Sequence, residues 1–417
     1  MTMTARVGDR IYWTESVFPL IMEYGTYLFA VLMFAGKFGT FREIGLYLPA
    51  FLWLLQGILK KKIDLEWREP LFIALIVFML SAVVSSLLSP SPWHSFHFFR
   101  REDLKVVLLY IVISTTFASP GKLKRLALLL AVTGVVYLIA GYTRIATDLF
   151  RAGIIQYEET RYYATVFLYF FPFILLQTLE GRKLKKALWT IPLLATLAGI
   201  LVIGARGSWL GVFGIACVWI FFRRGKTGNV STILKIGTPV IIAVVLAVFL
   251  FFPGQYDIIK KHTLQKVQMS LRLETWNTFL LMSQERLFTG HGLDDAAMTE
   301  HYREFYKGLK GAYPLEGFNP TTPHNQFIKV LYQQGVAGLL FYTGVLGILF
   351  SGIIKTFLRN RERDYAFVGI AVMAAVLGEY VIRCLTEDRS LVPLSLLLGM
   401  AGAYMNLREE SKGRVEG

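Results

Sequence analysis

The sequence predicts an all-α protein, a polytopic bundle of helices that cross a membrane. Hydrophobic residues make up 54% of the 417 residues, 32 of them Phe, and the mean hydropathy is +0.50. Apolar runs close to the length that spans a bilayer recur along the whole chain. The stretch from Phe252 to Gly335 is the one long polar interruption. We therefore expect about twelve transmembrane helices, with a helical segment outside the membrane between the ninth and the tenth.

Each expected span is an apolar run bounded by charged or turn-forming residues. The first run contains Glu23 and lacks a small-residue cleavage site, so we interpret it as a retained span and not as a signal peptide. The expected spans are 17–36, 44–59, 70–89, 104–118, 126–145, 164–180, 187–204, 207–222, 233–252, 336–357, 365–384 and 391–406.

The positions of Lys and Arg predict the orientation. The segments at the N-terminus, at the C-terminus and in alternate loops hold most of the Lys and Arg outside the long polar segment, which predicts that both termini are cytoplasmic. The long segment then lies outside. The expected organisation is spans 1–9 in residues 1–252, an outer segment in 253–335 with amphipathic helices, and spans 10–12 with a cytoplasmic tail in 336–417. The net charge of +15 reflects this topology, and no nucleic-acid-binding motif accompanies it.

Several short outer segments carry polar residues. His94 and His97 share the segment 90–103, where an interfacial aromatic belt is favoured over a metal site. Arg161 lies just before the sixth span, either as a snorkelling anchor or as a contact to a phosphate. Glu379 and Arg383 are four residues apart, and we favour a structural i,i+4 pair. The two cysteines, Cys217 and Cys384, offer no disulfide framework and no metal pattern.

Spans 7 and 8 are joined by the tight turn Ala205-Arg206-Gly207-Ser208. An arginine between two apolar helices is costly unless it has a partner or water. Charge asymmetry would place a simple anchor on the other side, so a functional Arg206 is favoured. Ser208 is suited to capping the following helix, and Gly207 leaves room for the backbone to approach a ligand.

The long outer segment is expected to form two helices. The first begins near Ser270, carries Leu273, Trp276 and Leu280 on one apolar stripe, and ends near Thr289-Gly290. The second is capped by Asp294 or Asp295 and reaches Lys307, before Gly308. These helices are expected to lie on the bilayer surface or on the bundle.

The outer segment ends in Thr322-Pro323-His324-Asn325-Gln326. Thr322 is a good N-cap and Pro323 suits the first helical position, which places His324 in the first turn of a helix. Free N–H groups and the positive end of the helix dipole favour an anion there and a neutral imidazole. The pattern indicates a base beside a phosphate, and the alternative is a purely structural polar residue at the start of a membrane helix.

These motifs together resemble the O-antigen ligase family of bacterial inner-membrane proteins, which includes related polymerases and protein O-oligosaccharyltransferases. The resemblance is strongest to the ligases themselves. The order and spacing of the motifs and the twelve-span layout cover most of the chain. The resembling stretches are Arg206-Gly207-Ser208-Trp209-Leu210-Gly211, Arg272 with Trp276, Gly290-His291-Gly292, His324-Asn325-Gln326-Phe327 and Gly335-Val336-Ala337-Gly338-Leu339-Leu340.

The resemblance implies a GT-C-like glycosyltransferase that moves a glycan from undecaprenyl diphosphate to an acceptor at the periplasmic face. For a ligase the acceptor is the lipid A–core oligosaccharide. By position, His324 resembles the general base, and Arg206 and Arg272 resemble the diphosphate-binding residues. We include Arg161 as a further candidate contact to the diphosphate. A histidine base and fixed arginines suit this chemistry.

No cofactor and no metal are expected for the reaction. The only Asp-Asp pair is Asp294-Asp295, with no convincing further ligands nearby, and the resemblance also implies a metal-independent, inverting transfer. A polymerase or a protein glycosyltransferase of the same superfamily is the first alternative, and the single modest outer segment favours a ligase. A transporter is a second alternative, but ionisable groups cluster near the outer ends of spans and no internal repeat is seen. His291 has no assigned role.

Overall fold

A computed structural model describes residues 13–63, 65–152, 155, 157–181, 183–223, 266–310 and 322–407. Within these ranges every regular element is helical, which confirms the all-α prediction. The first half contains η1 (Trp13–Val17), α2 (Phe18–Leu32), η2 (Gly36–Phe38), α3 (Gly39–Lys60), α4 (Pro70–Leu87), α5 (Pro92–Phe98), η3 (Phe99–Asp103), α6 (Leu104–Thr116), α7 (Pro120–Ala152), α8 (Tyr157–Glu180), α9 (Lys183–Ile203) and α10 (Arg206–Phe222).

The second half contains the remaining helices. They are α13 (Lys266–Glu285), α14 (Asp295–Lys310), α15 (Gln326–Arg359), α16 (Ala366–Ala375), η4 (Val376–Ile382), η5 (Arg383–Leu385) and α17 (Val392–Met405).

The membrane character of the fold rests on six helices that are long and apolar enough to cross a bilayer. They lie within α4, α7, α8, α9, α15 and the stretch Ala366–Leu385, and α10 and α17 are shorter apolar helices. The chain is therefore a multi-pass membrane protein. Helices cover the expected spans except 233–252, which lies outside the described residues, so the count of twelve stays a prediction.

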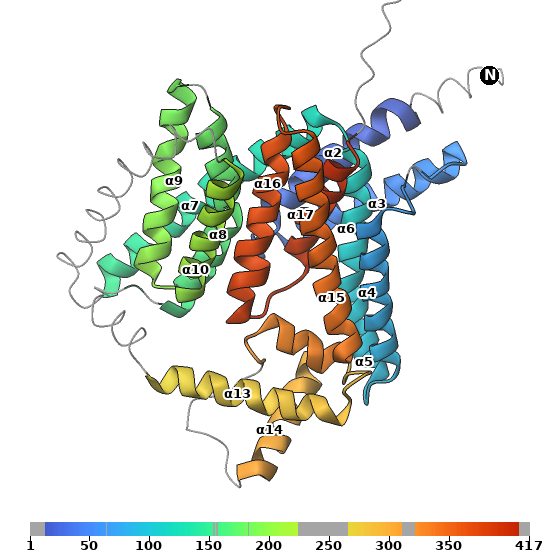
Figure 1. Ribbon diagram of the computed structural model, residues 1–417, viewed down its shortest axis with the longest axis vertical. Helices are drawn as coiled ribbons and strands as arrows, with labels where there is room; N and C mark the ends of the chain where they lie inside the picture. Colours follow the sequence, from blue (N-terminus) through green and yellow to red (C-terminus); the bar gives the residue numbers. More distant parts are fainter. Residues whose placement is uncertain are drawn as a thin grey trace, which may run out of the picture.

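The centre of the bundle is formed by α16 and α17, which pack against each other (Figure 1). Every residue of α16 is buried, as is the run from Leu394 to Tyr404 in α17. Neighbouring helices enclose this pair, with α8 and α10 against α16 and η4, and α6 and α15 against α17. The polar chain that follows η5 is consequently held at one end of the most buried part of the protein.

Across that end lie α13 and α14, beside the start of α15 (Figure 1). Their own apolar cluster joins α13 to α14 and α15 through Phe279, Met282, Met298, Tyr302, Tyr306 and Tyr332. The predicted stripe on α13 is not the face that packs against the protein, because Leu273 and Leu280 are exposed while Phe279 and Met282 are fully buried. The aromatic side chains of α14 and α15 select this other face. The alternative, that the predicted stripe faces the bilayer surface, stays a prediction.

The caps of these helices follow short-range rules. Asp294 accepts from the backbone N–H groups of Ala296 and Ala297, at 2.9 and 3.3 Å, which confirms it as a cap of α14. The helix does not stop before Gly308 as predicted but continues to Lys310. A single glycine lowers helix stability by about 1 kcal/mol and does not by itself end a helix.

A break in α15 at Gly335 joins the outer helices to the bundle. Gly335 has a φ of 70° and a ψ of −170°, so the helix is interrupted there. The backbone carbonyls of Tyr332 and Gln333 therefore lack the N–H partners that a continuous helix would supply one turn later. The chain at Gly290-His291-Gly292 replaces those partners: His291 N–H donates to Tyr332 O at 2.9 Å and Gly292 N–H donates to Gln333 O at 3.0 Å. In return, Val336 N–H donates to Leu287 O at 2.8 Å.

Glycine is required on both sides of this joint. A Cβ at Gly335 would lie 2.4 Å from Phe288 O, and a Cβ at Gly290 would lie 2.2 Å from Gln333 O. Both residues also have positive φ, which L side chains rarely adopt. The glycines of these two motifs therefore let one backbone approach another, and the joint sets the position of α13 relative to α15.

Candidate active site at the outer end of the bundle

The residues around His324 do not form the predicted helix start. The N-cap of α15 is Asn325, whose side chain accepts from Phe327 N–H and Ile328 N–H at 3.0 and 3.2 Å. The prediction of Thr322 as cap is therefore wrong, and His324 precedes the cap instead of lying in the first turn. Asn caps at least as well as Thr, and Asn325 adopts the extended backbone that a cap requires. His324 itself has a left-handed backbone with a φ of 49°.

This strained loop is held by the end of η5 and by the chain that follows it. Thr322 Oγ1 donates to Asp388 Oδ1 at 2.8 Å, and Asn325 Nδ2 donates to Leu385 O at 3.1 Å. Arg389 N–H donates to Gln326 Oε1 at 2.9 Å. Non-glycine residues keep a left-handed backbone only where the surroundings fix it, and these bonds from both sides of His324 supply that restraint.

A third element, α13, also contacts the loop. Trp276 Nε1 donates to Pro323 O at 2.9 Å. Trp276 lies one helical turn from Arg272 on α13, so the same contact brings that arginine toward His324. The Trp276 side chain is therefore a bridge between the outer helix and the His324 loop.

His324 lies beside one carboxylate. Its Nδ1 is 3.7 Å from Asp388 Oδ1, which is too long for a hydrogen bond but close enough for the carboxylate to attract a protonated imidazole. Asp388 is held in turn by Thr322 and by Lys329, whose Nζ lies 3.5 Å from Oδ2. Burial lowers the pKa of His324, Asp388 raises it, and the charges of Arg161 and Arg272 lower it further, with a net lowering. The imidazole is therefore neutral at neutral pH, as expected of a general base.

Arg161, on α8, is bound to the chain after η5. Its Nε donates to Glu387 Oε1 at 2.9 Å, and its charge acts on His324 together with that of Arg272 on α13. Arg161, Arg272 and His324, three of the four residues singled out in the sequence, are thus close enough to interact electrostatically. Arg161 lies more than a hundred residues before the other two in the sequence.

Arg206 lies near the chain after η5, through the contact of its neighbour Gly207 with Thr386. It is the first residue of α10 and its side chain is exposed. A Cβ on the adjacent Gly207 would lie 2.7 Å from Thr386 Oγ1, so the space at Gly207 is filled by the chain after η5 and not left for a ligand as predicted. Ser208 does not cap α10 either, because Ala205 occupies the N-cap position and Ser208 is buried inside the helix.

Sequence reasoning missed a buried network of charges behind the site. The expected pair forms, with Arg383 Nη1 3.2 Å from Glu379 Oε2 and both side chains almost fully buried. Arg383 Nη2 also donates to Glu387 Oε2 at 3.0 Å. Arg389 contacts Glu387 as well, and lies 3.4 Å from Glu379. Glu379, Arg383 and Glu387 recur every four residues, and this spacing is the sequence pattern that could have predicted the network.

This network fixes the charge of Glu387. Burial alone raises the pKa of its carboxyl, but Arg383, Arg389 and Arg161 together outweigh burial and lower that pKa to about 2. Glu387 is therefore ionised throughout the physiological range. Among these side chains, three arginines face two glutamates, so the network keeps an excess positive charge beside His324.

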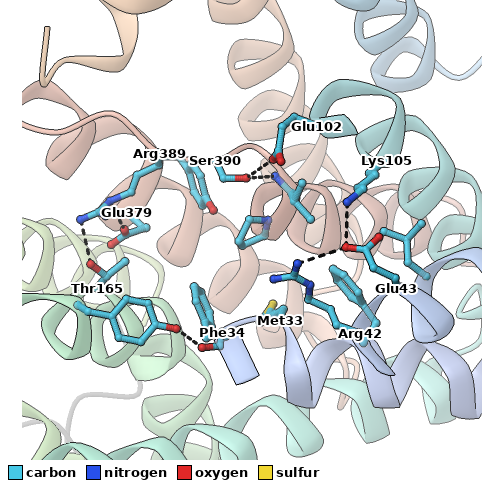
Figure 2. A pocket seen from close by; sticks show the side chains of 17 residues that line it. Met33, Phe34, Arg42, Glu43, Glu102, Lys105, Thr165, Glu379, Arg389 and Ser390 are labelled. Atoms are coloured by element: carbon cyan, nitrogen blue, oxygen red, sulfur yellow. Dashed lines mark hydrogen bonds and ion pairs between the residues drawn. The ribbon is translucent and has the colours of Figure 1, made fainter. Parts of the chain in front are cut away.

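Two cavities meet behind the network. The larger, about 570 Å³, is lined by Phe34, Arg42, Glu43, Lys105 and other residues of α2, α3, α6 and α8 (Figure 2). The smaller, about 370 Å³, reaches Lys329 and Asp388. Glu102, Arg389 and Ser390 line both. His324 lines neither cavity, but Asp388, its neighbour, lines the smaller one.

The charged groups of the larger cavity are already paired. Lys105 Nζ donates to Glu43 Oε1 at 2.9 Å, and Ser390 Oγ donates to Glu102 Oε2 at 3.1 Å (Figure 2). Arg389 Nη2 donates to Thr165 Oγ1 at 2.9 Å. These pairs leave a polar lining with aromatic walls rather than a strongly cationic one.

One comparison with known proteins matches the part of the chain that contains three of the four predicted site residues. Residues 191–343 match the family described as O-antigen ligase. The chain carries an O-antigen ligase family domain. No curated protein shows significant similarity to the chain. The family match supports a membrane enzyme of the ligase and polymerase type that acts on glycan lipids.

The O-antigen ligase domain includes Arg206, Arg272, His324 and the Gly290–Gly335 joint, and it excludes Arg161 on α8 and the chain after η5. The segments outside the matched range therefore complete the surroundings of His324.

Neither residue of the Asp294-Asp295 pair is a free carboxylate. Asp294 caps α14, and Asp295 Oδ1 lies 3.0 Å from Lys329 Nζ.

Proposed function

We propose that this protein transfers a glycan from undecaprenyl diphosphate to the lipid A–core oligosaccharide, at the periplasmic face of the bacterial inner membrane. The observation that carries the proposal is the placement of a neutral His324 beside Asp388 and within the field of Arg161 and Arg272. The O-antigen ligase family match supports the same class of reaction. The predicted orientation, with both termini in the cytoplasm, would place this end of the bundle outside.

In the proposed reaction His324 acts as general base. The acceptor hydroxyl loses its proton to the imidazole, and its oxygen forms a bond to the anomeric carbon of the donor. The bond from that carbon to the diphosphate oxygen breaks, and the electron pair leaves with the lipid diphosphate. A single displacement inverts the anomeric centre. Asp388 then stabilises the imidazolium, in the role that a carboxylate plays beside a catalytic histidine.

The arginines are proposed to bind the diphosphate. Negative charge grows on the leaving group, and fixed cationic donors aimed at that charge lower the barrier. Arg161 and Arg272 approach from α8 and α13, and Arg206 from the start of α10. Arginine suits this task because its planar group can bind two phosphate oxygens at once. The excess positive charge of the Glu387 network favours the same anion.

The larger cavity is proposed to hold sugar residues of a substrate. Pocket linings that combine aromatic walls with a few fixed polar groups are typical of small-molecule sites, and Phe34, Tyr162 and Lys105 provide such groups here. Arg389 and Ser390 connect this cavity to the Asp388 side of the site. No divalent metal is assigned to the reaction, because the arginines supply the positive charge.

The test is the lipopolysaccharide pattern of a deletion strain complemented with the wild-type gene or with His324→Gln. A ligase predicts that deletion removes long glycan chains from lipopolysaccharide while lipid-linked polymer is retained, and that only the wild type restores them. Loss of the lipid-linked polymer itself would identify a polymerase instead. Normal lipopolysaccharide in the deletion strain would contradict both activities and point to another acceptor, such as protein.

A matched control is Arg303→Gln, which removes a half-buried arginine on α14 that pairs with Glu300 at 3.4 Å and lies outside the proposed site. This variant should restore the pattern as well as the wild type does. Equal protein levels in the membrane have to be verified for each variant, since loss of the protein and loss of the reaction give the same gel.

A further inference from the structure

Three possible metal ligands gather on the outer helices, and none of them lines the two cavities described above. Glu285 is the last residue of α13, His291 lies in the connection between α13 and α14, and His301 lies on α14. One ligand atom from each residue lies within 4.8 Å of the other two. His301 Nε2 is 3.2 Å from Glu285 Oε2. Within the described residues, this is the one group of three or more such side chains.

The second nitrogen of each imidazole is already engaged. His291 Nε2 lies 3.0 Å from Met282 O, and His301 Nδ1 lies 3.0 Å from Tyr332 Oη. Histidines that bind metals use their other ring nitrogen in this way, which fixes the tautomer and orients the ring. The arrangement leaves His291 Nδ1, His301 Nε2 and a Glu285 oxygen as the three ligand atoms.

The rings are held before any ion binds. His291 stacks on Tyr332, with ring centroids 4.5 Å apart and an interplanar angle of 4°. The two imidazoles are 4.8 Å apart between centroids. The backbone of His291 is fixed by its bond to Tyr332 O within the glycine joint. These contacts explain why a histidine lies between the two glycines, a feature with no role in the proposed transfer.

The ligand set selects the kind of ion. Two imidazoles and one carboxylate suit Zn²⁺, whereas Mg²⁺ and Ca²⁺ prefer oxygen ligands alone. Tetrahedral Zn²⁺ with ligands at about 2.0–2.2 Å places them roughly 3.3 Å apart. The pair of His301 and Glu285 already has this spacing, and because the ligand atoms all lie within 4.8 Å of one another, His291 needs to move inward by at most roughly 1.5 Å. Glu285 is 46% exposed and His301 is 26% exposed, so water can take the fourth position.

We propose that Glu285, His291 and His301 form a Zn²⁺ site that fastens the end of α13 to α14 and, through Tyr332, to α15. The ion would hold in place the helix that carries Arg272 and the helix that begins beside His324. This role is structural and does not depend on the transfer reaction proposed above. Without an ion, the same three side chains would form a contact between His301 and Glu285, with His291 stacked on Tyr332 beside it.

The experiment uses the full-length protein in detergent, purified with a tag that contains no histidine and treated with chelator. Co²⁺ is the probe, because its visible absorption becomes intense in a tetrahedral site, and Zn²⁺ is then added as competitor. We expect one Co²⁺ per chain, displaced by Zn²⁺. Glu285→Gln and His301→Gln should each weaken binding at least tenfold. Tyr332→Phe removes the outer partner of His301 and should weaken binding about tenfold.

The matched control is His97→Gln on α5, which removes an exposed histidine outside the cluster and should bind Co²⁺ as the wild type does. Zn²⁺ should also raise the Tm of the wild type but not that of His301→Gln. A wild type that binds no Co²⁺ would overturn the proposal. Binding of equal strength in His301→Gln, or its loss in His97→Gln, would do so as well, because the ion would then be held elsewhere.

Discussion

Replacing Asp388 by Asn tests whether this carboxylate supports His324 in proton transfer. The Asn side chain keeps the shape and an oxygen that can accept from Thr322, but it removes the negative charge 3.7 Å from His324 Nδ1. Lys329 keeps a second partner in Asp295 at 3.0 Å, so the substitution does not strand a buried cation. The effect should therefore be confined to the protonated imidazole.

The expected size follows from the distance and the exposure of the pair. Two unit charges 3.7 Å apart attract by about 4.5 kcal/mol at an effective dielectric constant of 20 and by about 1.1 kcal/mol in water. His324 is 39% exposed and Asp388 is 14% exposed, so screening reduces the larger figure. We expect a loss of about 1–3 kcal/mol in transition-state stabilisation, or about 5- to 150-fold in rate.

The assay is kcat/KM for glycan transfer as a function of pH. Because burial and the two arginines lower the pKa of His324, wild-type activity should persist below pH 6.5, the ordinary value, and fall as the imidazole is protonated. Asp388 raises that pKa, so Asp388→Asn should lower it further. The plateau should drop while the acid limb moves to lower pH.

The control is Thr322→Val, which removes the hydrogen bond to Asp388 but leaves the carboxylate charge. It should reduce the rate less than Asp388→Asn and leave the acid limb close to that of the wild type. Wild-type activity in Asp388→Asn, or an acid limb that moves to higher pH, would refute the reasoning and leave Asp388 as a structural residue.

Four further predictions follow from the same structure. Gly335→Ala should lower the free energy of unfolding by about 3 kcal/mol or more, since the positive φ alone costs about 1–3 kcal/mol and a Cβ would lie 2.4 Å from Phe288 O. Gly347→Ala, on the same helix, is the control because a Cβ there has open space around it. Equal Tm values for the two variants would contradict this prediction. His324→Gln should abolish transfer but leave donor-lipid affinity largely intact, and a rate near that of the wild type would make His324 a positioning residue. Arg206→Lys and Arg272→Lys should each impair transfer, because a point charge does not replace a bidentate group; full activity of both at normal protein levels would remove the arginines from the proposal. Addition of Mg²⁺ or Mn²⁺ to chelated enzyme should leave the transfer rate unchanged, and recovery of lost activity by either ion would assign a metal to the reaction.

The sequence by itself determined the all-α class and the membrane character, because hydropathy over about 20 residues is a property of local composition. It also indicated Asp294 as a cap, since capping depends on three or four neighbouring residues. The prediction of Thr322 as the cap failed within the same rule. Thr322 and Asn325 are both good caps, and the contact of Asn325 with Leu385 at the end of η5 favours Asn325.

Tertiary structure decided how the candidate site is assembled. Arg161, Arg272, His324 and Asp388 come from four separate parts of the chain, and no local pattern shows that they meet. The glycine joint is similar. From the sequence, Gly290 and Gly335 are ordinary helix-breaking residues, and only the structure shows that each lies against the backbone of the segment that contains the other. Periodicity and capping depend on residues a few positions apart, whereas a site depends on which helices pack together, and in this bundle that is decided by the buried faces of α13, α15 and α16.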